Sequence, residues 1–111
     1  MKQDLDTKNQ VKQILKVIEE LAPGRSVELR IPPYAAIQCV SGSTHRRGTP
    51  PNVVEMSGQT LITLSKTPDL WDQLCSEGEI NASGTNSNFA DLFMQVSKLI
   101  SNFDEGFVNG K

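Results

Sequence analysis

Two alternating segments separated by a pair of prolines set the strongest limit on how this chain folds. From Ser26 to Ile31, apolar and polar residues alternate strictly, as in a strand with one buried face. Pro32 and Pro33 end this strand, because two prolines remove two donors from the hydrogen-bond ladder. The segment from Tyr34 to Val40 predicts a second strand, and so short a link predicts antiparallel pairing.

Three amphipathic segments supply helices to cover such a sheet. Residues 8–22 carry apolar residues at helical spacing, with Thr7 and Gln10 forming a capping box at the start. Residues 67–78 begin with threonine and proline and end at glycine, which is typical of a shorter helix. Residues 87–103 carry the longest apolar stripe and predict a C-terminal helix, and we expect the tail, residues 104–111, to fray.

The remaining segments complete an α+β prediction for a single domain of residues 1–111. Residues 53–56 and 79–83 predict further strands. Residues 59–66 fit either a strand or a short helix, because periodicity does not decide so short a segment. We therefore expect about five strands, mostly antiparallel, in a twisted sheet with helices on one face.

Composition excludes several classes of function. With 111 residues and a formal net charge of −2, the chain has room for one core and lacks the bulk positive charge of nucleic-acid binders. It has no apolar run near the roughly 18 residues of a membrane span, and its polar start predicts a cytoplasmic protein. Cys39 and Cys75 match no metal-ligand spacing, so we expect reduced thiols, no metal and no cofactor.

Positive charge is concentrated in the middle of the chain. All four arginines lie between residues 25 and 47, where Glu28 is the single acid. Guanidinium groups bind carboxylate and phosphate in bidentate fashion, so this window suits an anionic head group or an acidic protein patch. Solvated arginines on strand edges and loops are the alternative. The segment 45–55, HRRGTPPNVVE, is either a rigid binding loop or a plain connector.

Catalytic motifs are missing from the sequence. It contains no G-x-S-x-G, H-E-x-x-H or P-loop pattern. His45 could pair with nearby serines or with Glu55, but no spacing specifies a triad. We therefore expect a protein that is not an enzyme, with an acid–base role for Glu55 kept as a minor hypothesis.

Several phrases resemble one known family. The run PGRSVELRIPPYAAIQCV and the phrase RGTPPNVVE are similar to the bacterial sterol carrier protein orthologues, and LWDQLCSEGEINASG resembles their wider superfamily. The resemblance covers roughly residues 8–93. It implies a sheet of about five strands covered by helices, with an apolar tunnel that holds acyl chains, sterols or similar lipids. It also implies a helix over residues 59–66, often with a tryptophan that this chain lacks.

On this resemblance we expect a carrier for a small apolar or amphipathic lipid. The residues expected to bind the ligand are His45, Arg46 and Arg47 at the head group, with Ile37, Val54, Leu61, Leu64, Trp71, Leu74, Phe89 and Phe93 lining the tunnel. Asn52 and Gln38 are further ligand-binding candidates, and Gln38, a polar residue in an apolar run, is expected to face either solvent or a cavity. The alternative is a protein-interaction or accessory domain whose cavity is filled by its own side chains. Many relatives end near Phe93, so the longer C-terminal helix packs on the core, covers the cavity or contacts a second copy.

Overall fold

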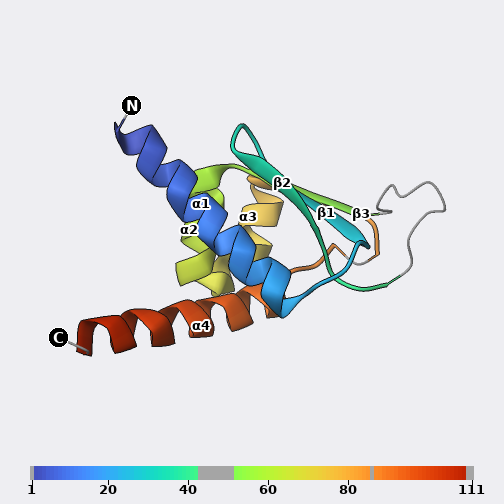
Figure 1. Ribbon diagram of the computed structural model, residues 1–111. Coiled ribbons are helices and arrows are strands. Elements are labelled where there is room, and N and C mark those ends of the chain that lie inside the picture. The colour runs from blue at the N-terminus through green and yellow to red at the C-terminus, as the bar shows by residue number, and fades with distance from the viewer. Residues whose placement is uncertain (1, 43–51, 86, 110–111) are drawn as a thin grey trace.

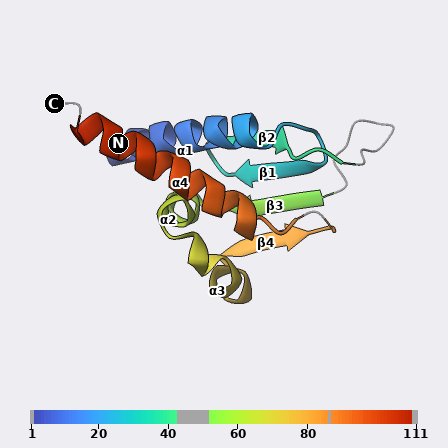
Figure 2. The same ribbon diagram turned by 90° about the horizontal axis from the view of Figure 1, so that it is seen from below.

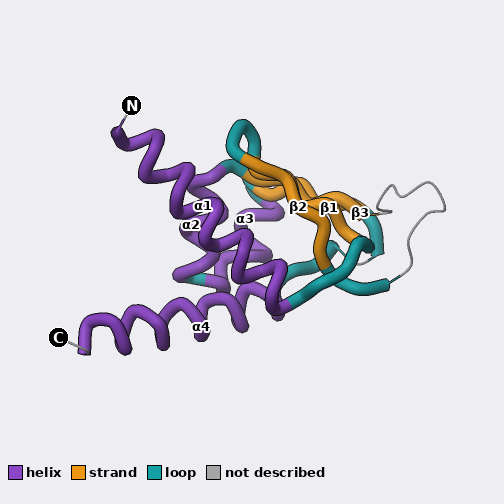
Figure 3. Tube along the Cα trace, in the orientation of Figure 1, coloured by secondary structure: helices purple, strands orange, loops and turns teal. Residues whose placement is uncertain are grey.

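The fold is an α+β layer in which one sheet carries all the helices on one side (Figures 1 and 3). The computed structural model describes residues 2–42, 52–85 and 87–109. The elements are α1 (Lys2–Leu21), β1 (Val27–Ile31), β2 (Ala35–Cys39), β3 (Asn52–Met56), α2 (Gly58–Lys66), the 3₁₀ turn η1 (Pro68–Leu70), α3 (Trp71–Ser76), β4 (Ile80–Ser83) and α4 (Ala90–Asn109).

The sheet is mixed. In the described part of the chain it has four strands in the order β2-β1-β3-β4. β1 pairs antiparallel with β2, as expected, and β3 pairs antiparallel with β4, but β1 and β3 are parallel. The α+β class is confirmed, and the expectation of about five mostly antiparallel strands is met only in part, because the described sheet has four strands and one parallel pair. Alternation predicts that a segment is a strand but not its direction, and the long connection after β2 lets β3 run beside β1 in the same direction.

Residues 59–66, which fit either a strand or a helix in the sequence, belong to helix α2. Ser57 caps this helix, because its hydroxyl oxygen accepts a hydrogen bond from the Thr60 backbone N–H at 3.1 Å. The cap satisfies one of the donors that a helix start leaves open, and it begins the helix after the Met56 end of β3. The fifth strand is therefore replaced by a helix.

Two helix boundaries differ from the prediction. α1 begins at Lys2, so Thr7 lies buried inside the helix and does not form a capping box at its start. α4 spans Ala90–Asn109 and therefore ends six residues beyond the predicted end at 103. Its start is set by Asn88, whose side-chain oxygen accepts a hydrogen bond from the Ala90 N–H at 2.9 Å.

The two faces of the sheet differ sharply. Val27, Leu29 and Ile31 of β1 are fully buried, because the helices cover their side of the sheet. Glu28 and Arg30 alternate with them on the other side, which no helix covers in the described structure (Figure 2). Between sheet and helices, α1, α2 and α4 pack against one another over a single apolar core. The fold thus offers an apolar interior and a polar open face as candidate sites.

Candidate functional site

The apolar residues predicted to line a tunnel do meet between the sheet and the helices. Ile37 and Leu74 are half-buried at the edge of this region. The others form part of the core and are almost completely buried: Val54, Leu61, Leu64, Trp71, Phe89 and Phe93. Sequence spacing therefore identified a real cluster, contributed by β2, β3, α2, α3, the segment before α4 and α4 itself.

Three aromatic rings occupy the centre of this cluster. Trp71 stacks on both Phe89 and Phe93, with ring centroids 6.1 Å apart in each pair. Phe89 and Phe93 lie 6.4 Å apart and tilted, one helical turn from each other. Such offset pairs are favourable beyond the apolar area that they bury. In this structure the rings take up space that a ligand tail would otherwise occupy.

Two of the polar residues predicted to bind the ligand, Asn52 and Gln38, lie in the described part of the chain, and their surroundings differ. Asn52 is buried at the start of β3, where its amide N–H donates to the Ser26 carbonyl at 2.9 Å. Gln38 is exposed on the open face of the sheet, and its side-chain oxygen accepts a hydrogen bond from Arg25 at 3.1 Å. His45, Arg46 and Arg47 lie outside the described residues.

A surface cleft reaches this interior between the end of α1 and the start of α4. We call it the α1–α4 cleft; its volume is about 390 Å³. It is lined by Leu21, Ala22, Val40, Ser41, Thr85, Asn88, Phe89, Leu92 and Gln95. Its apolar part includes Phe89, which is also a member of the aromatic stack, and its rim is uncharged and polar. One ring therefore separates the cleft from the core.

The wall of this cleft is set by backbone geometry that spacing in the sequence does not reveal. Val40 has a φ of 66°, which is rare for a β-branched residue. Its N–H donates to the Ala22 carbonyl at 2.6 Å, and its carbonyl accepts from the Ser26 N–H at 2.9 Å. A side chain at Gly24 would collide with the Val40 backbone, so glycine is required there. Gly24, which the sequence indicates only as the end of a helix, thus packs against the Val40 wall of the cleft.

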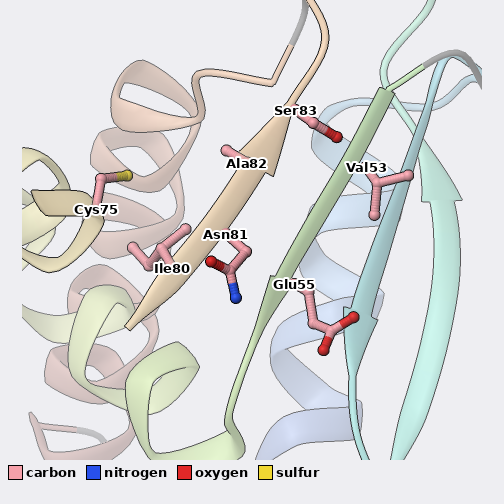
Figure 4. Close-up of a pocket in the computed structure, with 7 residues that line it drawn as sticks. All are labelled: Val53, Glu55, Cys75, Ile80, Asn81, Ala82 and Ser83. Atoms are coloured by element: carbon pink, nitrogen blue, oxygen red, sulfur yellow. The ribbon is translucent and has the colours of Figure 1, made fainter. Parts of the chain in front are cut away.

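The open face of the sheet carries two further clefts. A cleft of about 460 Å³ follows β4 and is lined by Val53, Glu55, Cys75, Ile80, Asn81, Ala82 and Ser83 (Figure 4). Another, of about 390 Å³, lies beside the β1–β2 turn and also includes Glu55. The Arg30 guanidinium lies 3.1 Å from a carboxylate oxygen of Glu28 and 3.8 Å from one of Glu55, so these three side chains form an ion-pair network on the open face. Because Glu55 is exposed and paired with Arg30, this geometry gives no support to an acid–base role for it.

Neither thiol is prepared for nucleophilic or metal chemistry. Burial, with a smaller contribution from Glu19, raises the pKa of Cys39 to about 12. Partial burial, followed by the nearby charge of Asp72, also raises the pKa of Cys75. Both groups are therefore neutral thiols near pH 7, whereas the thiolate is the reactive and metal-binding form.

The part of the chain that the structure describes contains neither a metal-binding cluster nor a membrane-spanning helix. No group of three or more His, Cys, Asp and Glu side chains there is arranged to hold a metal ion. No helix among these residues combines the length and apolar content needed to cross a membrane.

Comparison with known proteins agrees with this picture of the fold. Residues 3–94 match the family described as "Bacterial SCP ortholog", which covers most of the chain and every strand. The match ends within the first turns of α4, so the last fifteen of its 20 residues lie beyond the matched region. No curated protein matches the chain.

Proposed function

This chain belongs to the bacterial SCP ortholog family, and we propose that it acts as a non-enzymatic carrier for a small apolar or amphipathic molecule such as an acyl chain or a sterol-like lipid. The observation that carries the proposal is the position of Phe89. Its ring lines the α1–α4 cleft and also stacks on Trp71 in the core. The cleft and the core therefore share the Phe89 ring, which a ligand tail would have to displace to enter the space between sheet and helices.

The dimensions and chemistry of the cleft suit such a ligand. A volume of about 390 Å³ lies within the range of small-molecule sites, and the lining combines apolar side chains with polar groups that can fix the orientation of a ligand. Leu21, Phe89 and Leu92 would contact the apolar part, while Ser41, Asn88 and other rim residues would bind a hydroxyl or carbonyl. A longer tail would continue among Val54, Leu64, Trp71 and Phe93, with Ile37 and Leu74 at the margin.

The head group is proposed to meet the segment that follows Gly42. Ser41 lines the cleft, and the predicted head-group residues His45, Arg46 and Arg47 come only a few positions later in the chain. A guanidinium pair favours a carboxylate or phosphate head. Asn52 and Gln38 are given no head-group role in this proposal, because the first is engaged with Ser26 and the second lies on the open face.

The first experiment is native mass spectrometry of gently purified protein, compared with a denatured sample. We expect a co-purified mass of lipid size that disappears on denaturation. A fluorescent fatty acid then measures affinity, and Ala22→Phe, which fills the α1–α4 cleft, should weaken binding at least about tenfold. The matched control is Ala36→Phe, which adds the same ring on the open face. Equal binding by both variants would reject the cleft as the entrance.

The head-group assignment has its own test. The double variant Arg46→Ala/Arg47→Ala should weaken the binding of an anionic lipid while leaving that of the matching alcohol almost unchanged. The loss is expected for the anion because an arginine–carboxylate contact is charge-assisted. If the anionic lipid binds the double variant as tightly as the wild-type protein, the arginines do not hold the head group.

A second candidate function follows from the aromatic stack. Trp71, Phe89 and Phe93 are all at most 4% exposed and fill the centre of the core. This favours an accessory or protein-interaction domain whose cavity is filled by its own side chains. A clean apo mass that stays unchanged after mixing with acyl chains and sterols would select this alternative.

A further inference from the structure

The last fifteen residues of α4 extend beyond the part of the chain that the family model matches. The family match ends at residue 94, whereas α4 continues to Asn109. Figures 1 and 2 show this helix projecting past the other elements, and the molecule measures 49 Å along its longest axis against 26 and 25 Å across. A solvated helix end is marginal in water, since most helix stability in proteins comes from packing of an apolar face. The projecting helix therefore calls for a partner.

The exposed side of α4 carries the apolar residues that such a partner would cover. Three large hydrophobic side chains are exposed in the described structure, and two of them lie on α4: Met94 at 42% and Leu99 at 43%. Five residues place these two about 140° apart around the helix, so a partner helix that covers Leu99 does not cover Met94. Leu92 is half-buried and lies seven residues before Leu99, which places both on one stripe two turns apart. Leu92 also packs against the core, so this stripe borders the core-facing one formed by Phe93 and Val96.

The charges beside this stripe identify the partner. Among the α4 side chains that the structure describes, Asp91 and Lys98 are the charged ones, and both are exposed. Neither makes an ion pair with the described part of its own chain. They are also seven residues apart, so they flank the same side of the stripe formed by Leu92 and Leu99.

We propose that α4 packs antiparallel against α4 of a second copy of this chain. In that arrangement Asp91 of each copy lies opposite Lys98 of the other, and the two-fold axis passes near Gln95. A parallel pairing would instead place Asp91 opposite Asp91 and Lys98 opposite Lys98, which is repulsive at both places. The surface is self-complementary only in the antiparallel sense, as a two-fold interface requires.

This geometry also packs part of the segment after residue 94 against the partner. Opposing residue 91 to residue 98 brings residues 96–99 of one α4 alongside the first turn of the other, where α4 borders the α1–α4 cleft. At 1.5 Å per residue the residues after 99 extend about 15 Å past the start of the partner's α4. The inference does not rest on ligand binding, because the dimer is defined by α4 alone.

The test measures the oligomeric state of the full chain by light scattering and sedimentation equilibrium between about 1 and 300 µM. We expect a dimer for the wild-type chain, and an at least about tenfold higher dissociation constant for Asp91→Lys and for Lys98→Asp. The double exchange Asp91→Lys/Lys98→Asp should restore association, because it recreates both pairs with opposite sign. Glu19→Lys, the same charge change on an exposed position of α1, is the matched control and should not dissociate the dimer.

Two further variants test the place of contact. Leu99→Glu should abolish the dimer while circular dichroism shows an intact fold, since Leu99 is partly exposed in the single chain. Gln95→Cys near the axis should form an intermolecular disulfide on mild oxidation, whereas Lys12→Cys on α1 should not. A wild-type chain that stays monomeric to 300 µM overturns the proposal. So does a dimer that survives both Asp91→Lys and Leu99→Glu, or a double exchange that fails to restore association.

Discussion

The replacement Phe93→Ala measures whether the interior is packed by its own side chains or hollow enough for a ligand. Phe93 is completely buried and contacts rings on two sides, with centroids 6.1 Å from Trp71 and 6.4 Å from Phe89. Truncating a phenylalanine in a packed core costs about 3–5 kcal/mol, the sum of lost apolar transfer and the cavity left behind. A domain of this size has a free energy of unfolding of only about 5–15 kcal/mol, so the loss should be large.

Trp71 makes the measurement direct. It is the single tryptophan of the chain and stacks on the ring that is removed, so its fluorescence reports the local packing while far-UV circular dichroism reports the helices. Urea unfolding of the variant should show a midpoint lowered in both signals, with a melting temperature lower by roughly 15 °C or more. Phe93→Leu keeps part of the volume and should lose about a third as much. Met94→Ala, at the exposed neighbouring position, should change stability by no more than about 0.5 kcal/mol.

A small effect would refute this reasoning. If Phe93→Ala loses less than about 1 kcal/mol with an unchanged denaturant slope, the ring does not support the core and the space around it is adaptable. That result would favour a preformed ligand cavity over an interior filled by its own side chains. A loss of 3–5 kcal/mol would mean that a ligand tail enters only by displacing a packed ring.

Three further predictions concern other parts of the fold. Gly84→Ala should lower the free energy of unfolding in urea by about 2 kcal/mol or more, because Gly84 has a φ of 101° and the added methyl would overlap the buried Asn52 side chain. Gly78→Ala is the control: Gly78 has a φ of 81° but open space around it, so the loss should be about 1 kcal/mol. Tyr34 donates a 2.6 Å hydrogen bond to Asp4, which raises the pKa of Tyr34 above 10, so the stability that it contributes is present below pH 10 and is lost as the pH rises through the folded-state pKa. Its absorbance titration should move back toward 10 in Asp4→Asn. The Cys39 thiol, buried and with a pKa near 12, should escape iodoacetamide at pH 8 until urea unfolds the chain, as mass spectrometry would show.

Alternation and helical spacing predicted most elements of the fold because they report which face of a segment is buried. The strict pattern in residues 26–31 and the diproline gave β1 and its antiparallel partner, as the structure confirms. The same pattern contains nothing about strand direction, so the parallel pairing of β1 with β3 was missed. Residues 59–66 form a helix that begins at a capping contact between Ser57 and Thr60, and their own periodicity did not distinguish this helix from a strand.

The candidate site was predicted in part for a related reason. Spacing identified Val54, Leu64, Trp71, Phe89 and Phe93 as inward-facing, but a sequence pattern does not distinguish burial by protein from burial by a ligand. Gln38 was expected to face either solvent or a cavity, and strand alternation with Ile37 and Cys39 places it on the open face of the sheet. The α1–α4 cleft was missed because its wall depends on backbone conformation at Val40 and on close packing at Gly24.

A packed interior and a carrier function are compatible if the ring at the boundary moves and the backbone does not. Phe89 lies directly before α4, and its carbonyl accepts a hydrogen bond from the Phe93 N–H at 2.9 Å, which fixes its backbone in the first helical turn. The adjacent Asn88 side chain caps the same turn. The Phe89 side chain faces the cleft on one side and Trp71 on the other. A change of its rotamer would therefore connect the cleft with the core without unfolding the helix. The barrier to ligand exchange would then depend on aromatic packing, and weakening the stack should speed both entry and release.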